Sequence, residues 1–203
     1  MDGPYIPPHR RLAAAAAASA VAAGAAAANA PARLVAFNAA TFSRPEPGDP
    51  GVVWGEYFIH SRGGNAALNT DVGTTSLFVR VVRSCTRHNN ELHVSAGDDY
   101  KNNQLFALLS DGSLYSKYYP KPVRIGTTPA WLAEASVAGV VLEAAARRGA
   151  FFVDGECVHV FSWDGDLPRI SLKVHRNGRL DVIPAPERCR VPALDAAVAV
   201  DGP

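Results

Sequence analysis

The stretch FFVDGECVHVFSW, residues 151–163, indicates an antiparallel β fold. Valine and aromatic residues, which favour strands, lie on both sides of Asp154-Gly155, a dipeptide typical of a tight type I′ hairpin turn. The same pattern recurs upstream around Asp111-Gly112 and downstream around Asn177-Gly178. We therefore predict three local hairpins, over residues 102–119, 151–163 and 169–183.

Other segments also carry strand signals. Val52–His60 is rich in β-branched and aromatic residues, and Thr74–Cys85 alternates in part between its two sides. Glu91–Ala96 is a further short strand, whereas the glycines and asparagines of Ser61–Gly73 indicate a loop. Asp164-Gly165 should turn the chain between the last two hairpins. Strands do not alternate with helices, which excludes a doubly wound nucleotide-binding fold.

One helix is expected, over residues 128–148. Thr128 can cap its first turn, and Pro129 at the first helical position loses no hydrogen bond. Gly149 is suited to end it in a left-handed conformation. An apolar stripe with spacings of three and four runs along one side: Trp131, Ala135, Ala138, Leu142 and Ala145.

These elements predict an α+β fold: a mostly antiparallel sheet or partly open barrel with one packed α-helix. The globular domain is expected over residues 52–183, with disordered tails at both ends. Residues 1–51 form an Ala/Pro-rich tail and linker, and residues 184–203 a flexible C-terminal tail. The three turn dipeptides leave a β-trefoil open as an alternative.

The N-terminal tract has two interpretations. Residues 13–32 contain 15 alanines in 20 positions, which is typical of a low-complexity tail that has nothing large to dock with. Alternatively, Arg10-Arg11 and the uncharged run that ends at Ala30 resemble a cleavable, twin-arginine-like export signal. The run is too weakly apolar to predict a membrane span.

Charge and cysteine content exclude some classes of protein. The 203 residues carry 20 Lys and Arg against 19 Asp and Glu, a net charge of +1 that argues against a dedicated polyanion binder. Three cysteines are too few, and odd in number, for a disulfide scaffold.

No convergent reactive set is visible. Phosphate-binding glycine motifs and a nucleophile elbow are absent from the sequence. Cys85 with His88, and Cys157 with His159, are the nearest thiol–imidazole pairs, and the second pair should share one face of a strand. We expect buried thiols, no catalytic residues, no metal ligands, no cofactor and no small-molecule substrate. An enzyme that uses Cys157 or Cys85 stays an alternative.

One group of residues could form an interaction surface. Between residues 80 and 124 there are seven Lys and Arg but four Asp and Glu, and tyrosines lie among the cations. Such aromatics can stack on bases, which leaves a weak nucleic-acid-binding module as an alternative to a protein surface. Trp163, beside a predicted turn, is either core or an exposed anchor. The candidate surface comprises Trp163, Tyr115, Tyr118, Tyr119, Lys117 and Lys121.

A resemblance to a known family rests on four segments after the alanine-rich tail. They are LFVRVVRSC (77–85), LLSDGSLYSKYYP (108–120), PAWLAEASVAGVVLEAA (129–145) and GECVHVFSWDG (155–165). The pattern resembles the small nuclear phosphoprotein encoded near the left end of the unique long region of alphaherpesviruses. The resemblance covers roughly residues 52–183 and implies a nuclear accessory protein of infected cells without known catalytic residues.

The sequence thus predicts a non-enzymatic viral accessory protein that acts through contacts with a viral or host protein. The expected location is the host nucleus, and no membrane association is expected. The alternative is a secreted bacterial β-rich domain, whose signal peptide would be the alanine-rich tract.

Overall fold

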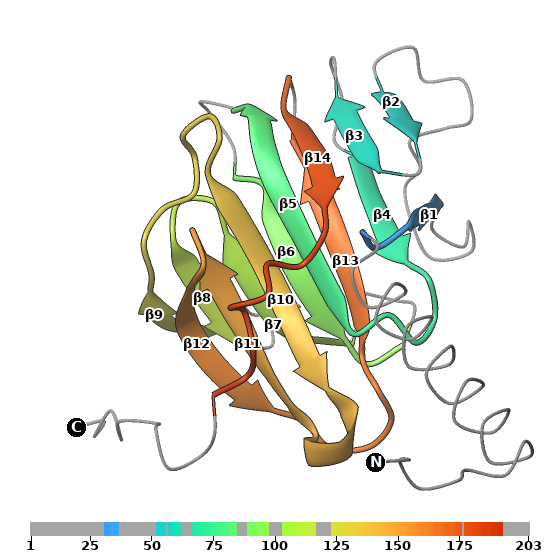
Figure 1. Ribbon diagram of the computed structural model, residues 1–203, viewed down its shortest axis with the longest axis vertical. Coiled ribbons are helices and arrows are strands. Elements are labelled where there is room, and N and C mark those ends of the chain that lie inside the picture. The colour runs from blue at the N-terminus through green and yellow to red at the C-terminus, as the bar shows by residue number, and fades with distance from the viewer. Residues whose placement is uncertain are drawn as a thin grey trace, which may run out of the picture. The chain divides into compact units, whose positions relative to one another are not determined.

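Two antiparallel sheets of seven strands each make up the described part of the chain (Figure 1). The computed structural model describes residues 31–36, 52–55, 57–61, 66–84, 89–97, 103–116, 123–175 and 177–192. The chain divides into two units, Met1–Ala30 and Pro31–Pro203, and all described residues belong to the second. None of the described helices is long and apolar enough to cross a membrane.

Each sheet combines hairpin neighbours with strands from distant parts of the chain. Sheet A has the order β1 (Leu34–Ala36), β4 (Ala66–Thr70), β13 (Arg169–Val174), β6 (Glu91–Ser95), β7 (Gln104–Leu109), β8 (Ser113–Ser116) and β9 (Val123–Thr127). Sheet B has the order β12 (Glu156–Ser162), β11 (Arg148–Val153), β10 (Val137–Glu143), β5 (Ser76–Arg83), β14 (Arg179–Ile183), β3 (Phe58–Ser61) and β2 (Val52–Gly55).

The main core lies between the two sheets, which form a β-sandwich. Leu68 and Ile170 enter it from sheet A, and Val79 and Val140 from sheet B, all at most 1% exposed. Burying each such side chain contributes roughly 1.5–3 kcal/mol. Trp131 lies in the same core on the connection from β9 to β10, and its indole N–H donates to the carbonyl of Leu109 at 3.0 Å. Trp131 is fully buried, although it does not lie on the helix expected from the sequence.

The predicted helix over residues 128–148 is wrong. In its place are strand β10, a single 3₁₀ turn over Ala144–Ala146 and the start of β11. Ala135 has a φ of 69°, which no right-handed helix contains. Ala138 lies between Val79 of β5 and Val153 of β11, so both flanking strands satisfy the backbone of β10. The expected α+β class gives way to a nearly all-β sandwich.

The reason lies in the spacing of the apolar residues. Ala138, Val140 and Leu142 alternate with outward residues and point into the main core, as a strand requires. Two of these three residues also satisfy a spacing of four, so a helical stripe and a strand face are indistinguishable over so short a run. Tertiary pairing then outweighs the helix propensity of alanine.

Two of the three predicted hairpins are confirmed. β7 pairs with β8 and β11 pairs with β12, as Asp111-Gly112 and Asp154-Gly155 predict. Asp154 and Gly155 have φ values of 50° and 86°, which fits a type I′ turn, whereas at the other turn only Gly112 has a positive φ. That turn closes through a hydrogen bond from Gly112 N–H to the carbonyl of Leu109.

The third hairpin prediction is wrong. Asn177-Gly178 does reverse the backbone, because Asn177 has a φ of 63° and Gly178 N–H donates to the carbonyl of His175. However, β13 belongs to sheet A and β14 to sheet B, so the turn carries the chain from one layer to the other. A turn dipeptide specifies a local reversal but does not specify which strand becomes the neighbour.

The other strand predictions have mixed outcomes. β5 and β6 confirm the strands expected within Thr74–Cys85 and Glu91–Ala96. The segment Val52–His60 instead splits into the paired strands β2 and β3, and the expected loop Ser61–Gly73 contains β4.

Strands and packed segments also lie outside residues 52–183. β1 pairs with β4 within residues expected to form the N-terminal tail. Residues 184–192, the described part of the expected C-terminal tail, cross the outer face of sheet B (Figure 1).

Candidate functional site

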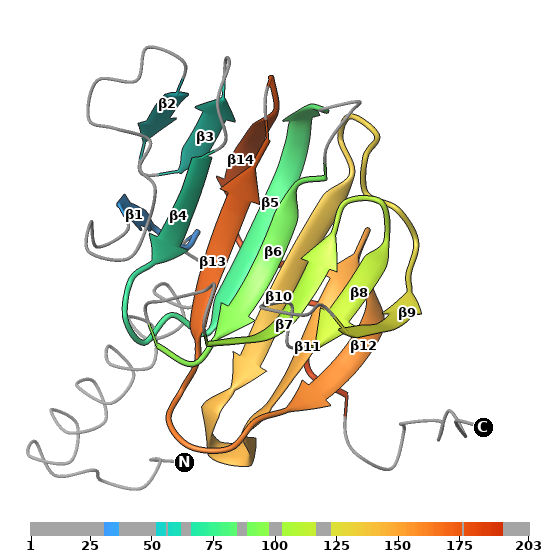
Figure 2. The same ribbon diagram turned by 180° about the vertical axis from the view of Figure 1, so that it is seen from behind.

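Strand β9 forms one of the two edges of sheet A. Among the described strands, β9 pairs with β8 alone, and its other side has no neighbour (Figure 2). Four of its five residues are exposed, and Gly126 is half-buried. Two of the exposed side chains are large and apolar: Val123 is 51% and Ile125 41% exposed. Strand-forming residues at this position remain in solvent because none of the described strands covers them.

A bulge shapes this edge. Leu114 of β8 lies opposite Gly126, and the next residue, Tyr115, lies opposite Arg124. Ile125 therefore has no partner in β8, and a bulge of this kind bends and twists the strand that carries it. The register places the half-buried ring of Tyr115 directly across from the exposed cation of Arg124.

The six residues of the candidate surface predicted from the sequence have different outcomes. Tyr115 lies on β8, at the exposed edge. Lys117, Tyr118, Tyr119 and Lys121 fall outside the described residues, in the segment that joins β8 to β9.

Trp163 has a different environment. It is 6% exposed and packs in the main core, so the core alternative holds for this residue and the exposed anchor does not. Its indole nitrogen has no hydrogen-bond partner among the described residues.

The thiol and imidazole of the second candidate pair lie on opposite faces of β12. The register shifts so that Cys157 lies opposite Phe152, while His159 lies opposite Phe151. Phe152 faces outward and Phe151 faces the main core, and directly opposed residues share a face of the sheet. The expectation that Cys157 and His159 share one face is therefore wrong. The bulge leaves Val158 without a partner in β11 and interrupts the alternation of faces along β12.

Partial burial also disfavours the charged forms of both side chains. It raises the pKa of the Cys157 thiol above its ordinary value, only partly offset by a hydrogen bond from the His159 backbone. It lowers the pKa of the His159 imidazole, which lies 6.2 Å from the ring of Phe106. A neutral thiol and a neutral imidazole that face apart do not form a nucleophile and base. Cys85 and His88 lie outside the described residues.

Sequence reasoning missed a buried polar cluster on the outer face of sheet A. Glu91 is its centre, with 4% of its side chain exposed. One carboxylate oxygen accepts from Lys173 at 2.8 Å and His175 at 3.0 Å, and the other accepts from His93 at 2.7 Å. The side-chain amide of Gln104 contacts the other ring nitrogen of His93. We call these five residues the Glu91 cluster.

The Glu91 cluster keeps its carboxylate ionised. Burial alone would raise the pKa of Glu91, but hydrogen bonds from His175 and His93, with the charges of His93 and Lys173, outweigh it. The pKa of Glu91 therefore lies well below its usual range. The described residues contain no group of side chains arranged to hold a metal ion. Lys173, His175 and His93 all donate to Glu91, so the donors of the cluster converge on its own buried carboxylate.

A signal for this cluster was present in the sequence. Glu91 and His93 are two apart in a predicted strand, which places both on the same face. Lys173 and His175 repeat that spacing near the end of the chain. Pairing between β6 and β13 brings the two sets together, with Lys173 directly opposite Glu91. That pairing cannot be read from spacing, because 82 residues separate Lys173 from Glu91.

Comparison with known proteins identifies the fold. No family model and no curated protein matches the sequence. Among solved structures, the chain is similar to a human SPRY domain, with a TM-score of 0.53 and 12% identity, over 66% of this chain and 94% of that chain. The SPRY domain of human HERC1 gives a TM-score of 0.50 and 13% identity, over 66% and 92%.

A TRIM65 PSpry domain gives a TM-score of 0.49 and 11% identity, over 92% of this chain and 100% of that chain. At these identities the likeness shows the fold alone, a β-sandwich of the SPRY type. The resemblance to an alphaherpesvirus nuclear phosphoprotein is therefore wrong, because the structural neighbours are SPRY domains. One of its four segments, residues 129–145, also forms the strand β10 instead of a helix.

Proposed function

We propose that this chain is a non-enzymatic protein-binding domain whose strand β9 pairs with an extended, acidic segment of a partner protein. The observation that carries the proposal is the open edge of β9, with its exposed Val123 and Ile125. SPRY-like domains act as protein–protein interaction modules, which supports binding rather than catalysis.

An open edge strand offers a ready template for a peptide. The backbone N–H and C=O groups on its free side have no ladder partner and can pair with an added strand. Apolar side chains beside that ladder provide contact area for alternate residues of the peptide. The bulge at Ile125 limits the number of consecutive pairs, which favours a short partner segment over indiscriminate edge-to-edge association.

Charge indicates what kind of segment fits. The sequence YSKYYPKPVRI, residues 115–125, contains Lys117, Lys121 and Arg124 and no acidic residue. This local excess stands out in a chain whose net charge is +1. Acidic side chains on the partner would therefore be attracted to this edge and held in register.

Designed peptides test the proposal. The probes are ten-residue peptides that alternate valine with glutamate or valine with lysine, titrated against the full chain by fluorescence anisotropy. We expect the acidic peptide to bind at least tenfold more tightly than the basic one. Methylation of alternate backbone nitrogens in the acidic peptide should abolish binding, because it removes the N–H groups that pair with β9.

A matched pair of variants locates the site. Arg124→Glu reverses an exposed charge on β9 and should weaken the acidic peptide at least tenfold. Arg190→Glu makes the same change at an exposed position in the segment over sheet B and should leave binding unchanged. Equal effects of the two variants, or binding that survives backbone methylation, would contradict the proposal. Preference for a single-stranded oligonucleotide, with affinity that falls linearly with log salt, would favour the nucleic-acid alternative instead.

The compartment stays a prediction: the nucleus, with secretion as the alternative. Sequencing the N-terminus of the mature protein separates the two, because a start at Met1 or Asp2 excludes export by cleavage at Ala30.

A further inference from the structure

The outer face of sheet B carries a second apolar cluster, which the C-terminal segment covers. Its buried members are Phe78, Ala150, Phe152 and Cys189. The first three come from β5 and β11, whereas Cys189 belongs to residues 184–192. Cys189 is 5% exposed, so this segment contributes a buried side chain to the sheet beneath it.

The C-terminal segment is anchored at the turn between β11 and β12. The guanidinium of Arg188 donates to the carbonyl of Asp154 at 2.8 Å and packs flat on Gly155, where a Cβ would meet it at 2.1 Å. The sulfur of Cys189 lies 3.9 Å from the carbonyl oxygen of Gly155. The segment also forms a tight turn of its own, in which the Cys189 N–H donates to the carbonyl of Pro186.

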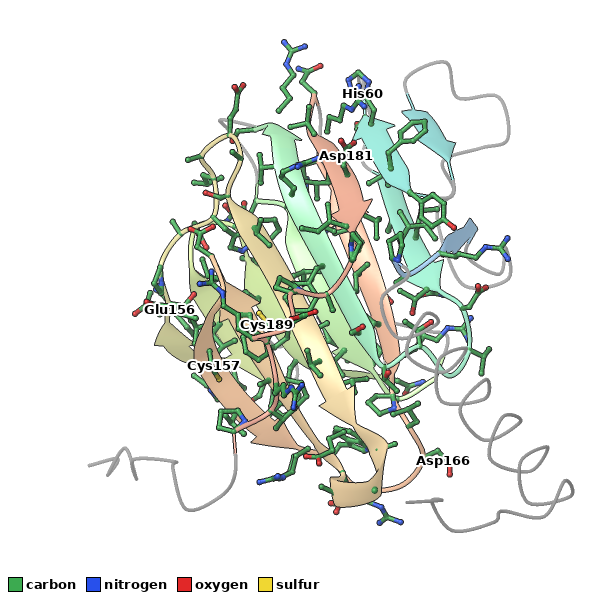
Figure 3. The ribbon with its side chains drawn as sticks, in the orientation of Figure 1. His60, Glu156, Cys157, Asp166, Asp181 and Cys189 are labelled. Carbon is green, nitrogen blue, oxygen red and sulfur yellow. The ribbon has the colours of Figure 1, made fainter. Side chains whose placement is uncertain are left out.

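A second thiol lies on the same face. Cys157 is two residues beyond Gly155, about 7 Å along the strand, and it lies directly opposite Phe152. Phe152 packs with Cys189 in the apolar cluster. Each of the two cysteines is therefore a neighbour of Phe152, and both are free thiols. Figure 3 labels Cys157 and Cys189.

We propose that Cys157 and Cys189 form a disulfide in an oxidising environment, which fastens the C-terminal segment to the edge strand β12. The bond requires that the segment bring the Cα atoms of the two cysteines within about 7 Å of each other. Cys157 is exposed, so an oxidant in solution reaches it first.

The chemistry needs a small-molecule disulfide such as oxidised glutathione. The Cys157 thiolate attacks one sulfur of the oxidant, which breaks its S–S bond, forms a mixed disulfide and releases one glutathione thiol. The Cys189 thiolate then attacks the Cys157 sulfur and releases the second glutathione. The protein loses two electrons and two protons, and the oxidant is reduced to two thiols.

The rate of closure should depend on pH. Burial raises the pKa of both Cys157 and Cys189, so few thiolates exist at neutral pH. Closure is therefore slow at neutral pH and should accelerate by about 50-fold or more between pH 7 and pH 9, because the thiolate fraction rises almost tenfold per pH unit below the pKa.

The test is peptide mapping of the full chain after incubation with oxidised and reduced glutathione. Digestion without a reductant should yield the peptide of Cys157 joined to that of Cys189. The loop of roughly 30 residues that the bond closes should raise Tm by about 5–10 °C. Trypsin should cut more slowly at Arg188 and Arg190 in the oxidised protein than in the reduced one.

Two variants make the result decisive. Cys157→Ser changes an exposed side chain, so the variant should fold yet lose both the linked peptide and the oxidant-dependent rise in Tm. Cys85→Ser removes the third thiol and should retain both. A map in which Cys85 is the partner, or in which Cys157 and Cys189 stay separately alkylatable after full equilibration with the oxidant, would overturn the proposal.

Discussion

The two outer faces of this sandwich are closed in opposite ways. Sheet A buries an ionised carboxylate among cationic and polar donors in the Glu91 cluster. Sheet B buries phenylalanines beneath the C-terminal segment. Both faces exclude water from the middle strands, but the first does so with hydrogen bonds and charge and the second with apolar contact.

The difference has a consequence for robustness. A buried ion is tolerated only while every partner is present, since losing one leaves an uncompensated charge. An apolar face loses stability in proportion to the contact removed. Sheet A should therefore respond steeply to single changes, and sheet B gradually.

The largest loss of stability is expected from Glu91→Gln. The substitution keeps the shape of the side chain and removes the charge that Lys173 and the two histidines surround. We expect a loss of about 3–5 kcal/mol in the free energy of unfolding, because those donors stay buried without their anion. Urea denaturation of the purified chain measures it.

Glu143→Gln is the matched control. Glu143 accepts from Arg148 at 3.1 Å, but half of the Glu143 side chain is exposed, so water screens its charge. The change should stay within about 0.5 kcal/mol of zero. Equal losses in the two variants would mean that the Glu91 cluster is no more than an ordinary surface pair.

On sheet B the equivalent test is Gly139→Ala. A Cβ at Gly139 would lie 2.1 Å from the ring of Phe78, which packs in turn against Phe152 at 6.0 Å. The ring must move within a filled cluster, so we expect a loss of about 1–3 kcal/mol. Gly126→Ala, where nothing lies within 4 Å, should be close to neutral in the same denaturation experiment.

The local features of this fold were predictable, and its long-range features were not. The turn dipeptides at Asp111 and Asp154 gave the hairpins β7–β8 and β11–β12, because the two strands of a hairpin lie beside each other in sequence. The layer change at Asn177 depends on where distant strands pair, and no local pattern carries that information. The helix error over residues 128–148 has the same origin, since β5 and β11 impose strand geometry on an alanine-rich segment.

The candidate sites show the same difference between residues that are neighbours in sequence and residues that distant strands bring together. The tyrosines and cations beside β9 were visible because they are neighbours in sequence, although Trp163 proved to be core. The Glu91 cluster was missed because its members come from β6, β7 and the end of β13. Contact between Cys189 and the turn at Gly155 was missed for the same reason, since 34 residues separate them.

The pH dependence of the free energy of unfolding should also distinguish the charged cluster of sheet A from the apolar cluster of sheet B. The pKa of Glu91 is lowered in the folded state, so its stabilising effect is complete above the unfolded value of about 4.3 and is lost as pH falls below it. Stability should then fall by up to about 1.4 kcal/mol per pH unit from this group. Glu91→Gln should flatten that part of the curve between pH 5 and pH 3, whereas Gly139→Ala should only displace it. Parallel curves for Glu91→Gln and the parent protein would contradict the role of the charge.

The smallest effect is expected at the anchor of the C-terminal segment. Arg188→Ala removes the hydrogen bond to the carbonyl of Asp154 and the guanidinium that covers Gly155. Arg188 is exposed, so water replaces much of what is lost, and we expect a decrease of about 0.5–1 kcal/mol in the free energy of unfolding. Arg190→Ala, at an exposed position in the same segment, should cost less than that. A loss at Arg188 as large as that of Glu91→Gln would show that sheet B, too, is closed by one indispensable polar contact, and the contrast between the two faces would disappear.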